Sequence, residues 1–177
     1  FMPHRPRGRS ERYGYLMQAN WRAWEAHFEA GKCNEIQSRF YGPRAVTELF
    51  DTPQDPWHVE NLAEKSEYQE IATELSDELD RWMIETRDIG LIPEPMFADL
   101  AGEGKKYKTI HEYAQSGEYP VRRILEVAKV SSSATSENTP DCLLYLEDKN
   151  PVIRYWGAYG LFLGRSADES IHQALLE

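Results

Sequence analysis

The sequence predicts an α+β region followed by an all-α segment of helical repeats. Residues 45–51 (AVTELFD) have the composition of a strand, which Pro53 ends because proline cannot continue a ladder of backbone hydrogen bonds. Residues 67–87 carry apolar side chains at the spacing of one helix face. Two later segments, 119–130 and 150–164, share a pattern that indicates an internal repeat.

A short helix is expected near the start of the chain, after a Pro-, Gly- and Arg-rich opening. It begins at Asn20, whose side chain can cap the first turn, and runs to about Ala30, with Gly31 as its stop signal. Its aromatic side chains share one face: Trp21, Trp24 and Phe28. Residues 33–40 (CNEIQSRF) then form either a short helical turn or an ordered loop.

The longest helix is expected over residues 67–87, where Ser66 and Gln69 have the spacing of a capping box. Its apolar stripe consists of Tyr68, Ile71, Ala72, Leu75, Leu79, Trp82 and Met83. A stripe with this period usually packs into a core, and we predict that here. The acids of the other face (Glu74, Asp77, Glu78 and Asp80) are interpreted as a solvated surface and not as a catalytic pair.

Helical repeats are expected in residues 119–177, after a linker over residues 98–118. Pro120 and Pro151 occupy matching positions, and each is placed at the first residue of a helix, where its missing N–H is not needed. The expected helices cover about residues 120–129, 139–148, 151–163 and 168–177. Gly157 and Gly160 weaken the third of these helices but allow a neighbouring helix to approach closely. Much of the packing is assigned to Tyr155, Trp156, Tyr159, Leu161, Phe162 and Leu163.

Charge and hydropathy exclude some classes of function. The net charge of −10 argues against a nucleic-acid-binding protein. The sequence has no apolar run long enough to predict a membrane span, and no secretory signal is visible. A chain that starts with Phe1 is interpreted as a processed or excised piece, so its compartment stays unknown. Cys33 and Cys142 fit reduced thiols as well as a single disulfide.

Catalytic and metal-binding motifs are missing from this sequence. It contains no Gly-x-Ser-x-Gly, no Gly-rich phosphate loop and no His-Glu-x-x-His. The five histidines have no partner at metal-ligand spacing. Cys33 has no neighbouring base that would activate it as a nucleophile. We therefore predict no catalytic residue and no metal ligand in this chain.

The basic opening segment has two interpretations, which stay open at this point. His4 and four arginines (Arg5, Arg7, Arg9 and Arg12) lie on a backbone stiffened by two prolines. Guanidinium groups can hold sulfate, phosphate or carboxylate through paired hydrogen bonds. Alternatively, the segment is an exposed basic loop that keeps the chain soluble or pairs with the acidic helix.

Several stretches of the sequence resemble a known enzyme family. ELFDTPQDPWHVENLA (residues 48–63), followed by a helix that ends RWMIETRD, is similar to the carboxy-terminal part of formylglycine-dependent sulfatases. The family pattern has tyrosine where this chain has Phe50. FMPHRPRG and GKCNEIQSRF resemble bacterial members of the heparan N-sulfatase (sulfamidase) branch. This resemblance covers residues 1–97, and the segment over residues 119–177 resembles HEAT-like repeats.

The resemblance implies a fold for this chain and places the catalytic groups elsewhere in the parent enzyme. Residues 1–97 would be a partial carboxy-terminal subdomain of the alkaline-phosphatase-like superfamily, with an incomplete antiparallel sheet and one long helix. One of its strands would enter at Phe1. The family nucleophile is a Cys or Ser in a C/S-x-P-x-R motif, converted to formylglycine, and neither Cys33 nor Cys142 lies in such a motif. Formylglycine and calcium are therefore implied for the parent enzyme, and no cofactor for this chain.

The resemblance also implies site residues and partners. His4 and Arg5, together with Asn34, Gln37 and Arg39, would line the substrate entrance of the assembled enzyme. The implied partners are the upstream catalytic domain of the same protein and a sulfated sugar or aryl sulfate. A parent that follows the family would be periplasmic or otherwise extracytoplasmic. The alternatives are a non-enzymatic repeat module that presents a concave surface to a protein partner, and an independent small hydrolase without a visible catalytic set.

Overall fold

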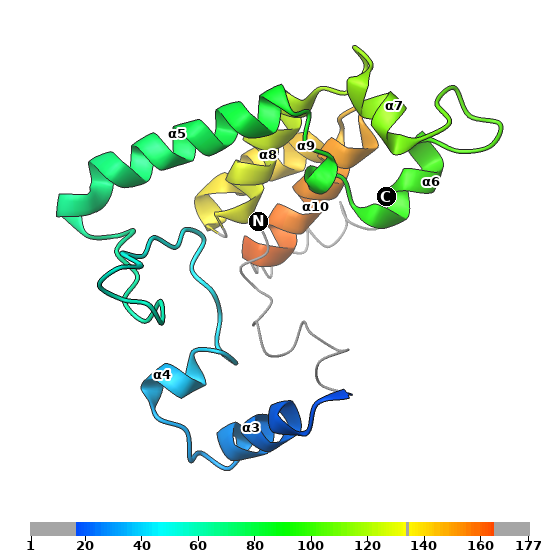
Figure 1. Cartoon of the computed structure of the whole chain (residues 1–177). Helices are drawn as coiled ribbons and strands as arrows, with labels where there is room; N and C mark the ends of the chain where they lie inside the picture. The colour runs from blue at the N-terminus through cyan, green and yellow to red at the C-terminus, as the bar shows by residue number, and fades with distance from the viewer. Residues whose placement is uncertain (1–16, 134, 165–177) are drawn as a thin grey trace. The chain divides into compact units, whose positions relative to one another are not determined.

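The computed structural model describes residues 17–133 and 135–164 (Figure 1). The chain divides into two compact units, Phe1–Ala72 and Thr73–Glu177. We call them the amino-terminal and carboxy-terminal units and describe each by itself. Within the part of the chain that is described, no helix has both the length and the apolar character needed to cross a membrane.

In the amino-terminal unit, helix α3 (Ala19–Glu29) starts two residues earlier than a cap at Asn20 predicts. Its cap residue is Gln18, so the predicted cap by Asn20 is wrong. The indole of Trp21 donates a hydrogen bond of 2.9 Å to the side-chain oxygen of Gln18. The predicted stop at Gly31 is confirmed, because this glycine has φ +66° and its N–H donates to the carbonyl of Phe28.

No strand is found among residues 17–133 and 135–164, so the predicted α+β class is wrong for the described chain. Residues 45–51 carry no regular structure because a loop pairs their backbone groups in place of a second strand. The N–H of Leu49 donates to Oδ1 of Asn61 at 2.9 Å, and the carbonyl of Leu49 accepts from the N–H of Leu62 at 2.8 Å. The strand expected at Phe1 lies outside the described residues.

Helix α5 (Gln69–Glu85) follows a 3₁₀ turn over Ser66–Tyr68. The predicted capping box is wrong, because Ser66 is not the cap residue and makes no capping bond. The side chain of Gln69 instead donates to the carbonyl of Ala63 at 2.6 Å, which ties the helix start to the preceding loop. The long helix itself is confirmed close to its predicted bounds.

The apolar stripe of α5 is largely exposed, which contradicts the prediction that it packs into a core. Met83 is buried, but Ile71, Leu75, Leu79 and Trp82 are each between 47% and 55% exposed. A 3.6-residue period shows that apolar residues share a face, and it does not show what covers that face. The stripe is therefore an apolar surface available for contact.

The carboxy-terminal unit packs around three helices, α8 (Val121–Ser132), α9 (Thr139–Leu146) and α10 (Pro151–Gly164). Figure 1 shows α10 running beside α8 and α9, in agreement with their contacts. Shorter elements precede or join them: Ile89–Leu91, Glu94–Met96, α6 (Phe97–Leu100), α7 (Ile110–Gln115) and Ser136–Asn138. Three expected helices are thus present, whereas the fourth, over residues 168–177, lies outside the described chain. The relation to HEAT repeats remains a prediction.

The core of this unit depends on close approach at α10. A Cβ atom built on Gly157 would lie 2.8 Å from the carbonyl oxygen of Cys142, and one on Gly160 would lie 2.4 Å from its Sγ. The predicted role of these two glycines is confirmed. Trp156 and Leu161 are buried as expected, but Phe162 is 62% exposed. Pro151 begins α10 as predicted, whereas Pro120 is the cap residue before α8 and not its first residue.

Arg87 joins the end of α5 to the segment before α8. Its backbone has φ +54°, and the N–H groups of Arg87 and Asp88 close the helix on the carbonyls of Ile84 and Met83. Its guanidinium donates to the carbonyls of Ala114, Ser116 and Tyr119, the last two at 2.6 and 2.9 Å. The hydroxyl of Tyr119 donates back to the carbonyl of Asp88 at 2.5 Å. One side chain therefore satisfies three carbonyls of this turn.

Alkaline pH is expected to destabilise the carboxy-terminal unit. Burial raises the pKa of Tyr119 and of Cys142 above their ordinary values of 10.0 and 9.0. The unfolded chain loses these protons first, so their contribution to stability is complete below about pH 9 and falls as pH rises further. Urea unfolding from about pH 7 to about pH 11 measures the decline, which Tyr119→Phe should make shallower. A free energy of unfolding that stays constant across this range would contradict the prediction.

Candidate functional site

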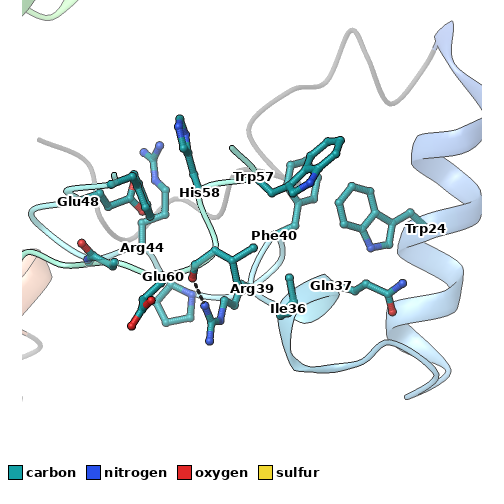
Figure 2. Close-up of a pocket in the computed structure, with 15 residues that line it drawn as sticks. Trp24, Ile36, Gln37, Arg39, Phe40, Arg44, Glu48, Trp57, His58 and Glu60 are labelled. Atoms are coloured by element: carbon teal, nitrogen blue, oxygen red, sulfur yellow. Dashed lines mark hydrogen bonds between the residues drawn. The ribbon is translucent and has the colours of Figure 1, made fainter. Parts of the chain in front are cut away.

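The candidate site is a hollow of about 920 Å³ in the amino-terminal unit. It lies between α3, helix α4 (Glu35–Ser38) and the loop over residues 43–61. Figure 2 shows Trp24 and Trp57 at one end, Arg44 and Glu48 at the other, and His58 between them. Its volume falls within the roughly 300–1,000 Å³ of typical small-molecule pockets.

An aromatic cluster builds one wall of this hollow. The rings of Trp24 and Phe40 stack with centroids 4.3 Å apart, and those of Phe28 and Tyr41 stack at 4.8 Å. Trp21 lies 5.2 Å from Phe40 in a tilted arrangement. The predicted aromatic face of α3 therefore packs on the residues that follow α4. Each such pair contributes about 0.5–1.5 kcal/mol beyond the area that it buries.

Asp55 and Asn61 fix the loop that forms the opposite wall. The Asp55 carboxylate accepts from the N–H groups of Val59 and Glu60 at 2.6 and 2.8 Å. The Asn61 side-chain amide donates to the carbonyl of Thr47 at 3.0 Å, in addition to its bond with Leu49. These side chains replace the backbone pairing of a sheet. Asp55 and Asn61 both belong to the stretch that resembles sulfatases. Their hydrogen bonds give them a role in folding this loop.

His58 has an unusual backbone at the tip of this loop. Its φ is +52°, a left-handed conformation that a non-glycine residue rarely adopts. Its ring stacks on Phe50 with centroids 4.8 Å apart, and its Nε2 lies 3.1 Å from Oγ1 of Thr52. The adjacent Trp57 side chain is 86% exposed. The loop thus fixes the ring of His58 and presents the exposed ring of Trp57 beside it, and both residues line the hollow.

Two predicted site residues cap helix α4. Oδ1 of Asn34 accepts from the N–H of Gln37 at 2.8 Å, and Oε1 of Gln37 accepts from the N–H of Asn34 at 2.9 Å. This reciprocal pair is a capping box, which confirms the helical-turn alternative for residues 33–40. Gln37 lines the hollow, whereas Asn34 supports the helix behind it.

Arg39 lies in the wall of the hollow and is already engaged by the protein. Its guanidinium donates to the carbonyl of Val59 at 2.5 Å and pairs with the carboxylate of Glu35 at 2.7 Å. The dashed line in Figure 2 marks the first of these bonds. Arg39 therefore links α4 to the loop. The other two predicted site residues, His4 and Arg5, lie outside the described residues, and substrate binding by this set stays a prediction.

The described residues contain no candidate metal-binding group, and their two cysteines do not pair. Among residues 17–133 and 135–164, no three His, Cys, Asp or Glu side chains come together to hold a metal ion. Cys33 and Cys142 are both free thiols. Cys142 is buried in the helical core, and burial raises its pKa, which disfavours the reactive thiolate.

The sequence did not identify three aromatic residues that line the hollow, Trp24, Trp57 and His58. Trp57 and His58 stand inside the stretch that resembles sulfatases, where no motif marks them, and the spacing of Trp24 indicates only a helix face. The available signal is a tryptophan between a proline and a histidine, in a stretch with a second proline. Whether such a ring packs inward or faces solvent depends on the fold, so the sequence alone did not identify it.

Replacing Asp55 with alanine is expected to loosen the loop. The change leaves the N–H groups of Val59 and Glu60 without their acceptor. An unsatisfied buried N–H destabilises a fold by about 1–3 kcal/mol, and the loss is smaller here because Glu60 is exposed. Amide hydrogen exchange at these two positions should become faster. Asp55→Asn keeps one acceptor oxygen and serves as the matched control. Equal protection in the wild-type and Asp55→Ala chains would show that the carboxylate does not hold the loop.

Comparison with known proteins gives one informative match. The chain is 42% identical over 65 residues to an ulvan-active sulfatase from Formosa agariphila. The match covers 36% of this chain and 11% of that protein, so the chain spans about a tenth of the relative's length. No family model and no solved structure matches the chain. The chain therefore contains a region related to a sulfatase.

Proposed function

We propose that this chain is the carboxy-terminal, non-catalytic part of a bacterial sulfatase that hydrolyses sulfate esters or sulfamates of sulfated sugars. The observation that carries the proposal is the 42% identity over 65 residues to an ulvan-active sulfatase. The loop over residues 48–63 adds support, because its family-like residues Asp55 and Asn61 accept the backbone hydrogen bonds that hold the wall of the hollow. The sulfamidase-like branch is part of this proposal.

The nucleophile and the metal belong to another part of the parent. Neither formylglycine nor calcium fits the described residues, since Cys142 is enclosed by helices and no acidic cluster is present there. Calcium needs several converging oxygen ligands, which this region does not supply. The hollow in the amino-terminal unit would then contribute to substrate binding next to the catalytic centre.

The exposed stripe of α5 would contact the upstream catalytic domain. Leu75, Leu79 and Trp82 are each more than half exposed on one face of the helix. Apolar surface of this kind marks a contact site when it is continuous. The relative that matches this chain is about nine times longer than the matched region, so a parent of similar size has a large domain to cover the stripe. Leu79→Asp should lower the yield of the folded parent while the chain alone stays soluble.

A protein-interaction role for the helical segment is the second candidate. Leu144 on α9 is 70% exposed, although its neighbour Cys142 is buried. This side chain would belong to the surface that meets a partner. In that case the sulfatase-like region would be a relic without an active parent.

The reading frame upstream of this chain separates the two candidates. The proposal requires a C/S-x-P-x-R motif in the same frame, together with acidic residues that can bind calcium. A frame with that motif supports the sulfatase. A frame that lacks the motif contradicts it and favours the interaction module.

A further inference from the structure

We infer that the hollow beside Trp57 binds the uncharged face of a sugar ring and not the sulfate group itself. This inference rests on the proposed function and refines it, because it states which part of a sulfated polysaccharide the amino-terminal unit would hold. It is carried by the exposed rings, the balanced charge and the braced loop of the hollow.

The aromatic end of the hollow presents ring faces to solvent. Trp57 is 86% exposed and Trp24 is 37% exposed, although both rings line a hollow with defined walls. The C–H groups on one face of a pyranose ring pack well against the flat face of an indole. Trp24 is held in place by its stack on Phe40 at 4.3 Å, so it can offer a fixed surface.

The polar end of the hollow has balanced charge. Among the described residues, its charged lining consists of Arg39, Arg44, Glu48 and Glu60, whose formal charges cancel. Arg39 is also paired with Glu35, and Glu60 with Lys65. Figure 2 places Arg44, Glu48 and Glu60 together at the end away from Trp24. A sulfate site needs an excess of donors and positive charge. Hydroxyl groups donate and accept, so neighbouring guanidinium and carboxylate groups suit a sugar edge better than an anion.

The loop restrains the backbone on both sides of Trp57 and leaves its ring exposed. Pro56 restricts the backbone immediately before Trp57, and the carboxylate of Asp55 accepts the two N–H groups that follow His58. His58 itself stacks on Phe50. A braced loop reduces the entropy lost on binding, which is the usual benefit of a preorganised site. Neither the overall charge of −10 nor the balanced lining favours a nucleic acid as the occupant.

The test is a titration of the 177-residue chain with neutral xylohexaose and cellohexaose and with chemically sulfated forms of both. Binding is followed by calorimetry and by the indole N–H signals in NMR spectra. At least one neutral oligosaccharide should bind and shift the Trp57 signal. Trp57→Ala should weaken that binding by about tenfold, because the apolar surface that the indole buries against the sugar is lost. Trp57→Phe should keep part of the affinity.

Trp82→Ala is the matched control, because Trp82 is an exposed tryptophan that does not line the hollow. Its affinity should equal that of the unmodified chain. Four outcomes would overturn the inference: no binding of any probe, unchanged binding by Trp57→Ala, binding of sulfated probes alone, or binding that disappears in the longer parent protein. Because the titration involves no hydrolysis, its failure is distinct from failure of the proposed sulfatase activity.

Discussion

Replacing Gly160 with alanine is expected to destabilise the carboxy-terminal unit by about 3 kcal/mol, since overpacking of a filled core has costs of this order. The added Cβ would lie 2.4 Å from Sγ of Cys142 and 3.1 Å from Cα of Ser131. Ser131 is part of α8, so one of these contacts is backbone that cannot move independently. The higher helix propensity of alanine offsets only about 1 kcal/mol. Urea unfolding followed by circular dichroism measures the change.

Two further variants identify the cause of that loss. Gly164→Ala adds the same atom in the same helix, where the nearest atom is the carbonyl oxygen of Thr135 at 3.7 Å, so its stability should stay close to wild type. Adding Cys142→Ala to Gly160→Ala removes the sulfur and should restore part of the stability, as a coupled pair does. Equal effects of Gly160→Ala and Gly164→Ala would show that the close approach is not what the core requires.

Replacing Arg87 with alanine is expected to destabilise the same unit by about 3 kcal/mol, because hydrogen bonds to charged groups contribute about 1.5–3 kcal/mol each and are not additive. The carbonyls of Ala114, Ser116 and Tyr119 would lose their common donor. Lysine has no planar fork and should rescue little of the loss. Thermal and urea unfolding of the two variants test this.

The left-handed backbone of Arg87 provides an internal check. Arg87→Gly loses the same hydrogen bonds as Arg87→Ala, but glycine adopts a φ of +54° without steric strain. The glycine variant should therefore be more stable than the alanine variant by about 1 kcal/mol. The opposite order would mean that the φ angle at this position is not maintained in solution.

Local signals predicted the longer helices, whereas the short helix α7 lies inside the segment expected to be a linker. Within a helix, proline is tolerated only in the first turn, so Pro151 marks the start of α10, and the repeat spacing places α8 near its observed position. The prediction of a strand over residues 45–51 is wrong because local signals are not sufficient for a strand. A strand needs a partner, and here the side chain of Asn61 takes the bonds that a partner would make. The composition of residues 45–51 does not show that a side chain, and not a neighbouring strand, will pair with their backbone groups.

Burial and site geometry were less predictable than helices. Leu75 and Leu79 have the period of a core face, yet both are more than half exposed, because the period does not identify a covering surface. In the hollow, Gln37 and Arg39 were found as polar residues of a turn. Their hydrogen bonds show that they support the site as well as line it. The exposure of the Trp57 ring could not be predicted from the sequence, since only the fold determines that this ring faces solvent.

The most direct test of the account is turnover, measured side by side for the 177-residue chain and for the longer parent. Both are assayed on an aryl sulfate and on a glucosamine N-sulfate. Enzymes lower such barriers by roughly 8–23 kcal/mol, which binding residues without a nucleophile or metal do not supply. The account predicts turnover by the mature, calcium-loaded parent and none by the chain. Turnover by the chain that survives repurification and chelation, or an inactive parent with confirmed formylglycine, would contradict it.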